Sequence, residues 1–134
     1  MIDLKSLKSQ YINGEWREGS SNLQIENRNP FNGEILATYK AGSNDDLNHA
    51  YAAAQQVQKE WAKTNPVSQR DVFDKAVAYL EANHEAFVDV IIDEIGGTRL
   101  KAEFEIGLVK NMLKEASTFP MRMNGSILPS PIDG

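Results

Sequence analysis

Residues 43–119 contain four successive stretches in which hydrophobic residues recur at intervals of three and four, and this periodicity constrains the fold more than any other feature. Positions three and four apart lie on one face of an α-helix, so each stretch predicts a helix with an apolar face. Pro66, Asn83 and the pair Gly96 and Gly97 divide the stretches. Because four apolar faces are unstable in water, the helices must pack on each other or on a larger body.

Capping residues place the ends of these predicted helices. Ser43 can accept a hydrogen bond from the amide three residues on, and Asp45 and Asp46 add carboxylates near the positive end of the first helix. Pro66 ends that helix, because proline has no amide proton to donate. Thr98 is expected to cap the fourth helix.

The boundary between the second and third helices is marked less sharply. Ser68 and Asp71 have the spacing of a capping box, so the second helix is expected to start between Pro66 and Ser68. Asn83 is expected to cap the third helix. The apolar period continues across Asn83, however, so a single bent helix from Ser68 to Ile95 is an alternative.

The apolar faces of the helices are expected to form a core. A compact fold of 134 residues would bury about two-thirds of the surface of its unfolded chain. The faces of the first and fourth helices comprise Leu47, Ala50, Tyr51, Ala54, Val57 and Trp61, and Ala102, Ile106, Val109, Leu113 and Ala116, respectively.

The segment before the helices has the pattern of short strands. Asn13 and Gly14 form the dipeptide of a tight hairpin turn, which predicts strands at Gln10–Ile12 and Glu15–Arg17. Further strands are expected at about residues 23–27 and 35–39, so residues 1–42 are interpreted as a β-hairpin and turn region.

The segment after the helices is interpreted as an extended arm over residues 121–134. Pro129 and Pro131 exclude a helix there and suit a strand that leaves the body of the fold. Such arms often pair with another subunit. Ile127 and Leu128 are therefore the residues expected to contribute to oligomerisation.

Charge and composition exclude several classes of function. A net charge of −5 argues against binding to a nucleic-acid backbone. No apolar run approaches the roughly 20 residues of a membrane span, and residues 1–10 lack the pattern of a secretory signal, so a cytoplasmic location is expected. The absence of cysteine excludes disulfides, thiolate metal sites and a cysteine nucleophile.

The remaining polar residues predict no catalytic, cofactor-binding or metal site. His49 and His84 lie far apart in the sequence, and neither has a partner four residues away or a nearby acidic orienting group of the kind found in metal sites. Each is interpreted as a surface or helix-end histidine. The glycines match neither of the phosphate-binding patterns of nucleotide sites. Paired carboxylates such as Glu103 and Glu105 are interpreted as a solvated helix face.

Five landmarks in order resemble the N-terminal part of the aldehyde dehydrogenase superfamily. The passage after Gly97 and the close of the chain are most similar to its benzaldehyde and vanillin dehydrogenase branch. The landmarks are Asn13-Gly14-Glu15-Trp16, Asn29-Pro30-Phe31-Asn32-Gly33-Glu34, an alanine-rich helix ending in Trp61, Arg70, and Glu94-Ile95-Gly96.

This resemblance implies an α/β parent of several hundred residues, of which the chain would be the opening quarter to third. The segment itself would be mostly helical: an N-terminal β-hairpin region, then residues 43–120 as the helical part of the cofactor-binding domain, then the start of the oligomerisation arm. In some members a monovalent cation lies beside the acidic residue that corresponds to Glu94. A cap or a surface ion pair explains Glu94 more simply.

The resemblance also implies the chemistry of the parent. A cysteine thiolate attacks the aldehyde, hydride passes to NAD or NADP, and a glutamate activates water to release the acid. None of these groups is expected within this chain, so it would bind no cofactor and would be inactive alone. Helices shaped to cover a sheet would leave apolar surface exposed in the isolated segment, which would therefore self-associate. Aldehyde would be a substrate only of the full-length parent. The alternative is a stand-alone helical interaction module derived from the same scaffold.

Overall fold

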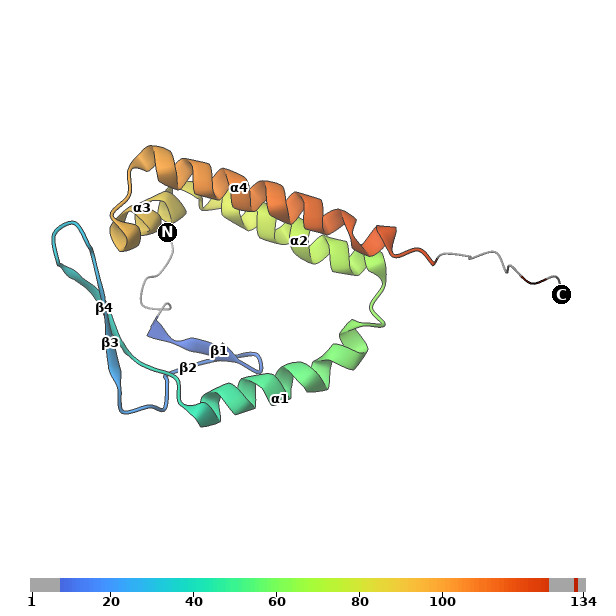
Figure 1. Cartoon of the computed structure of the whole chain (residues 1–134), viewed down its shortest axis with the longest axis horizontal. Helices are drawn as coiled ribbons and strands as arrows, with labels where there is room; N and C mark the ends of the chain where they lie inside the picture. Colours follow the sequence, from blue (N-terminus) through green and yellow to red (C-terminus); the bar gives the residue numbers. More distant parts are fainter. Residues whose placement is uncertain (1–7, 126–131, 133–134) are drawn as a thin grey trace.

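The computed structural model describes residues 8–125 and residue 132, and its described part is an open ring of helices and two β-hairpins (Figure 1). Helices α2, α3 and α4 form one side of the ring, and helix α1 with the first hairpin forms the other. The elements in chain order are β1 (Gln10–Ile12), β2 (Glu15–Arg17), β3 (Gln24–Arg28), β4 (Ile35–Lys40), α1 (Asn44–Trp61), α2 (Pro66–Ala82), α3 (His84–Ile95), α4 (Arg99–Thr118) and the short 3-10 helix η2 (Pro120–Arg122).

The two hairpins are separate antiparallel pairs. β1 pairs with β2, and Asn13 and Gly14 between them adopt φ values of 52° and 84°, as the predicted tight turn requires. β3 pairs with β4, with an irregularity in register at Asn27 and Arg28. Their bounds lie within one residue of the strands expected from the sequence.

The start of α1 confirms the predicted capping box. The amide of Asp46 donates to the Ser43 hydroxyl over 3.1 Å, and the amide of Ser43 donates to the Asp46 carboxylate over 3.0 Å. These two bonds satisfy donors that the first turn of a helix leaves free. The side chain of Thr98 likewise accepts from the amide of Lys101 and caps α4, as expected.

The predicted capping box of the second helix is wrong. α2 begins at Pro66, two residues before Ser68, and its cap is Asn65, whose side-chain oxygen accepts from the amide of Val67 over 2.8 Å. Proline is favoured at the first position of a helix because that amide has no partner there. Ser68 therefore lies within the first turn and does not precede it.

Asn83 separates α2 from α3, which excludes the single bent helix. Its role differs from the expected one, because its side chain makes no capping bond to α3. The side-chain amide of Asn83 instead donates to the carbonyl oxygen of Tyr79 over 2.9 Å, so it closes α2. Gly96 ends α3 in the left-handed conformation with φ of 67°, which favours glycine.

The buried core is small, and its main cluster lies between α3 and α4, while Val77 of α2 and Ile12 of β1 are buried outside that cluster. Val88, Ala102 and Ile106 are almost fully buried there, and Phe87, Ile91 and Ile92 pack around them. Two of the predicted inward residues of α4 are thus in the core, but Val109 is exposed. The described residues do not cover the apolar face of α1: Asp46 is the only buried residue of that helix.

The whole chain exposes more surface than a self-contained fold of its size. Its solvent-accessible surface is 10385 Å², whereas a compact monomer of its mass, 14.9 kDa, would expose about 7,000 Å². The chain buries about half of its unfolded surface rather than the expected two-thirds. The helices therefore pack only partly on each other, and the sequence-based alternative of a larger body gains support.

Two expectations depend on residues that the structure does not describe. Ile127 and Leu128, the predicted oligomerisation residues, lie outside the described residues, as does most of the predicted arm over residues 121–134. The predicted boundaries of the helical region, after residue 42 and after residue 120, stay predictions. None of the helices in the described part of the chain has the length and apolar character needed to span a membrane.

Candidate functional site

A buried carboxylate joins the first hairpin to helix α1. Asp46 is only 3% exposed, and it accepts hydrogen bonds from the backbone amide and the hydroxyl of Ser20, each over 2.8 Å. Arg17 lies 3.4 Å away on the other carboxylate oxygen. The backbone hydrogen bond from Ser43 and those from Ser20 hold the pKa of Asp46 well below its usual range. Asp46 therefore stays ionised and acts as a structural link, not as a proton donor.

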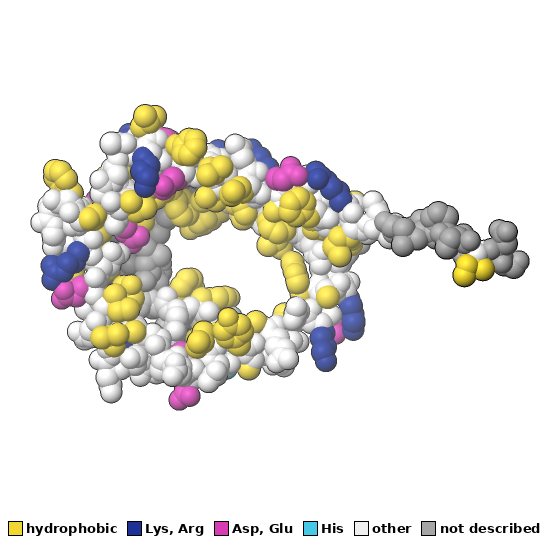
Figure 2. All heavy atoms as spheres, in the orientation of Figure 1, with side chains coloured by type: hydrophobic (Ala, Val, Ile, Leu, Met, Phe, Trp, Pro, Cys, Tyr) yellow, Lys and Arg dark blue, Asp and Glu magenta, His cyan; other side chains and the backbone are white. Residues whose placement is uncertain are grey.

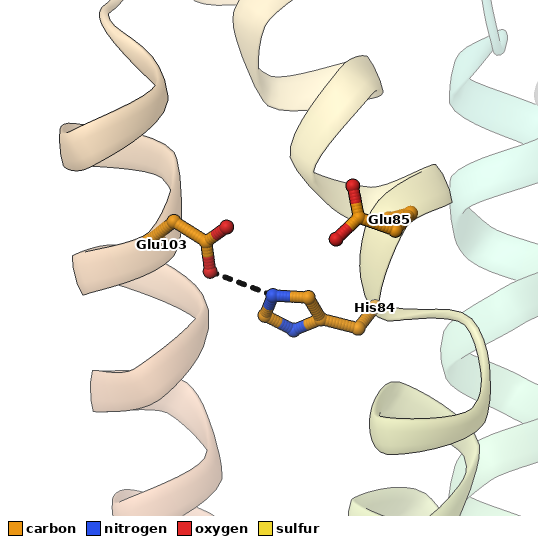
Figure 3. A group of neighbouring side chains, drawn as sticks. All are labelled: His84, Glu85 and Glu103. Atoms are coloured by element: carbon orange, nitrogen blue, oxygen red, sulfur yellow. Dashed lines mark hydrogen bonds and ion pairs between the residues drawn. The ribbon is translucent and has the colours of Figure 1, made fainter.

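A second polar cluster joins α3 to α4 (Figure 3). Nε2 of His84, at the start of α3, lies 2.6 Å from a carboxylate oxygen of Glu103 on α4. Glu85 lies beside them, and ligand atoms of the three residues lie within 4.8 Å of one another, as in a group that could hold a metal ion. His84 begins α3, as expected of a helix-end histidine, but the expectation that no acidic orienting group lies near it is wrong. His49 lies instead next to Arg17.

Arg99 supplies positive charge to the same cluster. One guanidinium nitrogen lies 2.7 and 2.9 Å from the two carboxylate oxygens of Glu85 and 3.0 Å from Glu103. The hydrogen bond from Arg99 lowers the pKa of Glu85, and Glu85 in turn raises the pKa of Arg99. Because the guanidinium already pairs with both carboxylates and Glu103 also contacts His84, the cluster is better explained as an ion-pair link between two helices than as a metal site.

A pocket lies where the second hairpin meets α3. It has a volume of about 270 Å³. The side-chain amide of Asn27 donates to Glu94 over 2.7 Å across this junction, so Glu94 holds β3 against α3. A cation beside Glu94 stays a prediction. The lining residues are Asn27, Leu36, Ala37, Tyr39, Val90, Asp93 and Glu94.

These clusters were only partly visible in the sequence. The capping role of Asp46 follows from its distance to Ser43, but its bonds to Ser20 cross 26 residues. The pairing of His84 with Glu103 depends on the packing of α3 on α4, which no local pattern encodes. All three clusters link secondary-structure elements, and the chain contains no cysteine thiol.

The fold and these landmarks define an aldehyde dehydrogenase segment. The model of the aldehyde dehydrogenase family matches residues 16–134, and the chain belongs to that family. It is 50% identical over 134 residues to the benzaldehyde dehydrogenase YfmT of Bacillus subtilis, covering all of this chain and 28% of that protein. It is 39% identical over 123 residues to a vanillin dehydrogenase of Corynebacterium glutamicum, covering 92% of this chain and 25% of that one.

Solved structures agree with these relationships. A NAD-dependent benzaldehyde dehydrogenase from Corynebacterium glutamicum matches with a TM-score of 0.90 and 38% identity, over 95% of this chain and 28% of that one. A putative aldehyde dehydrogenase from Bacillus subtilis matches with a TM-score of 0.92 and 31% identity, over 99% of this chain and 30% of that one. The resemblance seen in the sequence is confirmed, as is the fold class. The chain spans between a quarter and a third of the relatives it matches.

Proposed function

We propose that the chain is the N-terminal scaffold of an NAD(P)-dependent aldehyde dehydrogenase that oxidises aromatic aldehydes to carboxylic acids. The observation that carries this proposal is the 50% identity to a benzaldehyde dehydrogenase over all 134 residues. The reaction consumes an aldehyde, water and oxidised nicotinamide cofactor, and it yields the acid, reduced cofactor and a proton. NAD and NADP are both compatible with the residues described.

The part played by this segment is structural. Family resemblance implies that a cysteine thiolate attacks the aldehyde, and the chain has no cysteine. Its polar clusters hold α1 against the first hairpin, α3 against the second hairpin, and α3 against α4. The chain alone is therefore expected to be inactive, and aldehyde and cofactor would bind to the full-length parent. A cytoplasmic location fits this role.

The second candidate is a stand-alone helical interaction module. The exposed apolar residues of α1 favour it, because a surface of this kind serves association. For the same reason the isolated chain is expected to form a dimer or larger species. The coding sequence after Gly134 separates the two candidates: an in-frame continuation supports the scaffold, and a genuine stop codon with stable expression of the short chain supports the module.

The enzyme proposal is tested with two purified proteins, benzaldehyde and either cofactor. Residues 1–134 alone should produce no NADH or NADPH. A fused chain, in which residues 1–134 replace the matching segment of YfmT, should produce it. Turnover by the isolated segment would refute the scaffold role. A fused chain that folds but is inactive would refute the proposal that this segment supports benzaldehyde oxidation.

A further inference from the structure

Helix α1 has an apolar surface that the described residues do not cover. Its 18 residues include a single buried side chain, the capping Asp46. Tyr51 at the middle of the helix is 71% exposed, and Leu47, Val57 and Trp61 are also exposed. A helix of this length is only marginally stable in water without tertiary contacts. α1 therefore requires a partner surface.

Helix α4 carries a second apolar stripe. Ala102 and Ile106 face the core, whereas a stripe at intervals of four residues is exposed on a different side of the same helix. A helix that is apolar on two sides is characteristic of a buried position. The exposed stripe comprises Leu100, Phe104, Leu108 and Met112.

The uncovered surface is large enough for an obligate interface. The whole chain exposes 10385 Å², which exceeds the value for a compact monomer by about 3,400 Å². Obligate interfaces bury roughly 2,000 to 5,000 Å² summed over both partners, or roughly 1,000 to 2,500 Å² on each, and are rich in apolar residues. The excess on this chain alone is therefore larger than one side of a typical obligate interface. Figure 2 shows hydrophobic side chains on both sides of the central opening of the ring, so one body could contact both sides.

We propose that the apolar surfaces of α1 and α4 bind the larger remainder of an aldehyde dehydrogenase, even when that remainder is a separate polypeptide. This chain and the separate remainder then form an active non-covalent enzyme. This inference rests on the proposed function. The remainder is defined as the part of YfmT that follows the segment matched by this chain, which covers 28% of that protein.

The remainder explains the surface better than a second copy of this chain does. The open ring matches the corresponding segment of a solved benzaldehyde dehydrogenase with a TM-score of 0.90, and that segment is 28% of a longer chain. The backbone therefore has the shape that it takes beside the rest of such a protein. A second copy would offer another open ring with the same exposed stripes, not a body that fills the opening.

The test compares three expressed forms: residues 1–134 alone, the fused chain, and residues 1–134 co-expressed with the separate remainder. The co-expressed polypeptides should copurify in equal amounts and should form NADH from benzaldehyde at a rate within tenfold of the fused chain. Light scattering after size-exclusion chromatography gives the mass of each species.

Each outcome of this comparison decides one proposal. The docking inference is overturned if the fused chain is active but the co-expressed polypeptides do not associate, or if the separate remainder stays insoluble. Either result leaves the proposed function intact. A homodimer of residues 1–134 that excludes the remainder also overturns it. A folded fused chain without activity overturns the proposed function itself.

A matched pair of substitutions on α1 locates the contact surface. Tyr51→Asp places a charge on the exposed apolar side, and Gln56→Asp places the same charge on an exposed position of the opposite side. Tyr51→Asp should weaken the complex at least tenfold, while Gln56→Asp should leave it unchanged. Circular dichroism of the complexes checks that α1 remains helical. Equal affinity for the two variants would contradict this surface as the docking site.

Discussion

Truncation of Ile106 is the sharpest test of the core between α3 and α4. Ile106 is 3% exposed and lies in one cluster with Val88 and Ala102, which are both fully buried. Ile106→Ala removes three carbon atoms, worth about 0.8 kcal/mol each in lost transfer free energy. The cavity adds a further cost, so a total loss of about 3 kcal/mol is expected in the free energy of unfolding. That loss raises the unfolding equilibrium constant by about two orders of magnitude.

The matched control lies two residues further along α4. Leu108 is 44% exposed, so Leu108→Ala should cost less than about 1 kcal/mol in the isolated chain. Urea titrations followed by circular dichroism give both free energies by linear extrapolation. Because the core is small, Ile106→Ala is also expected to lower the helical signal before urea is added. Equal losses for the two variants would refute the assignment of the core to this face of α4.

Three further predictions concern single positions. The pKa of Asp46 is lower in the folded state than in the unfolded state, where it is about 4. Ionised Asp46 therefore stabilises the fold above about pH 4, and this stabilisation is lost as the pH falls below that value. Asp46→Asn should flatten the dependence of thermal stability on pH in this acid range. Gly96→Ala should lower the free energy of unfolding by about 1 to 2 kcal/mol, because φ is 67° and the added carbon would lie 2.8 Å from Pro30, and a urea titration measures this. Gly107→Ala should raise it by about 0.5 to 1 kcal/mol in the same assay, since the new methyl group meets open space in a helix interior; a loss there would contradict the packing of α4.

Local chemistry determined what could be predicted about the fold. Ser43, Thr98 and the Asn13 turn act through bonds or dihedral angles within three residues, and all three were identified from the sequence. The second capping box failed because Asn65 and Ser68 both carry capping side chains, and the position of proline favours the first.

The parts that could not be predicted depend on tertiary packing. The link from His84 to Glu103 joins two helices, and its partners are 19 residues apart. The exposed apolar stripe of α4 that includes Leu108 was not recognised in the sequence. The residues of the buried face already recur at helical intervals, so the periodicity of α4 was assigned to that face alone. The exposure of the α1 face within this chain could not be predicted, because periodicity identifies an apolar face but does not show which body covers it.

The unequal distribution of buried side chains has a consequence for the dynamics of the ring. Helix α4 shares the core with α3, whereas α1 contributes only Asp46 to the interior. Amide protons in segments with few buried contacts exchange with solvent through local opening, at a lower free energy than those in a packed core. In hydrogen–deuterium exchange the amides of α1 should therefore be replaced well before those of α4, and the two sides of the ring should open independently.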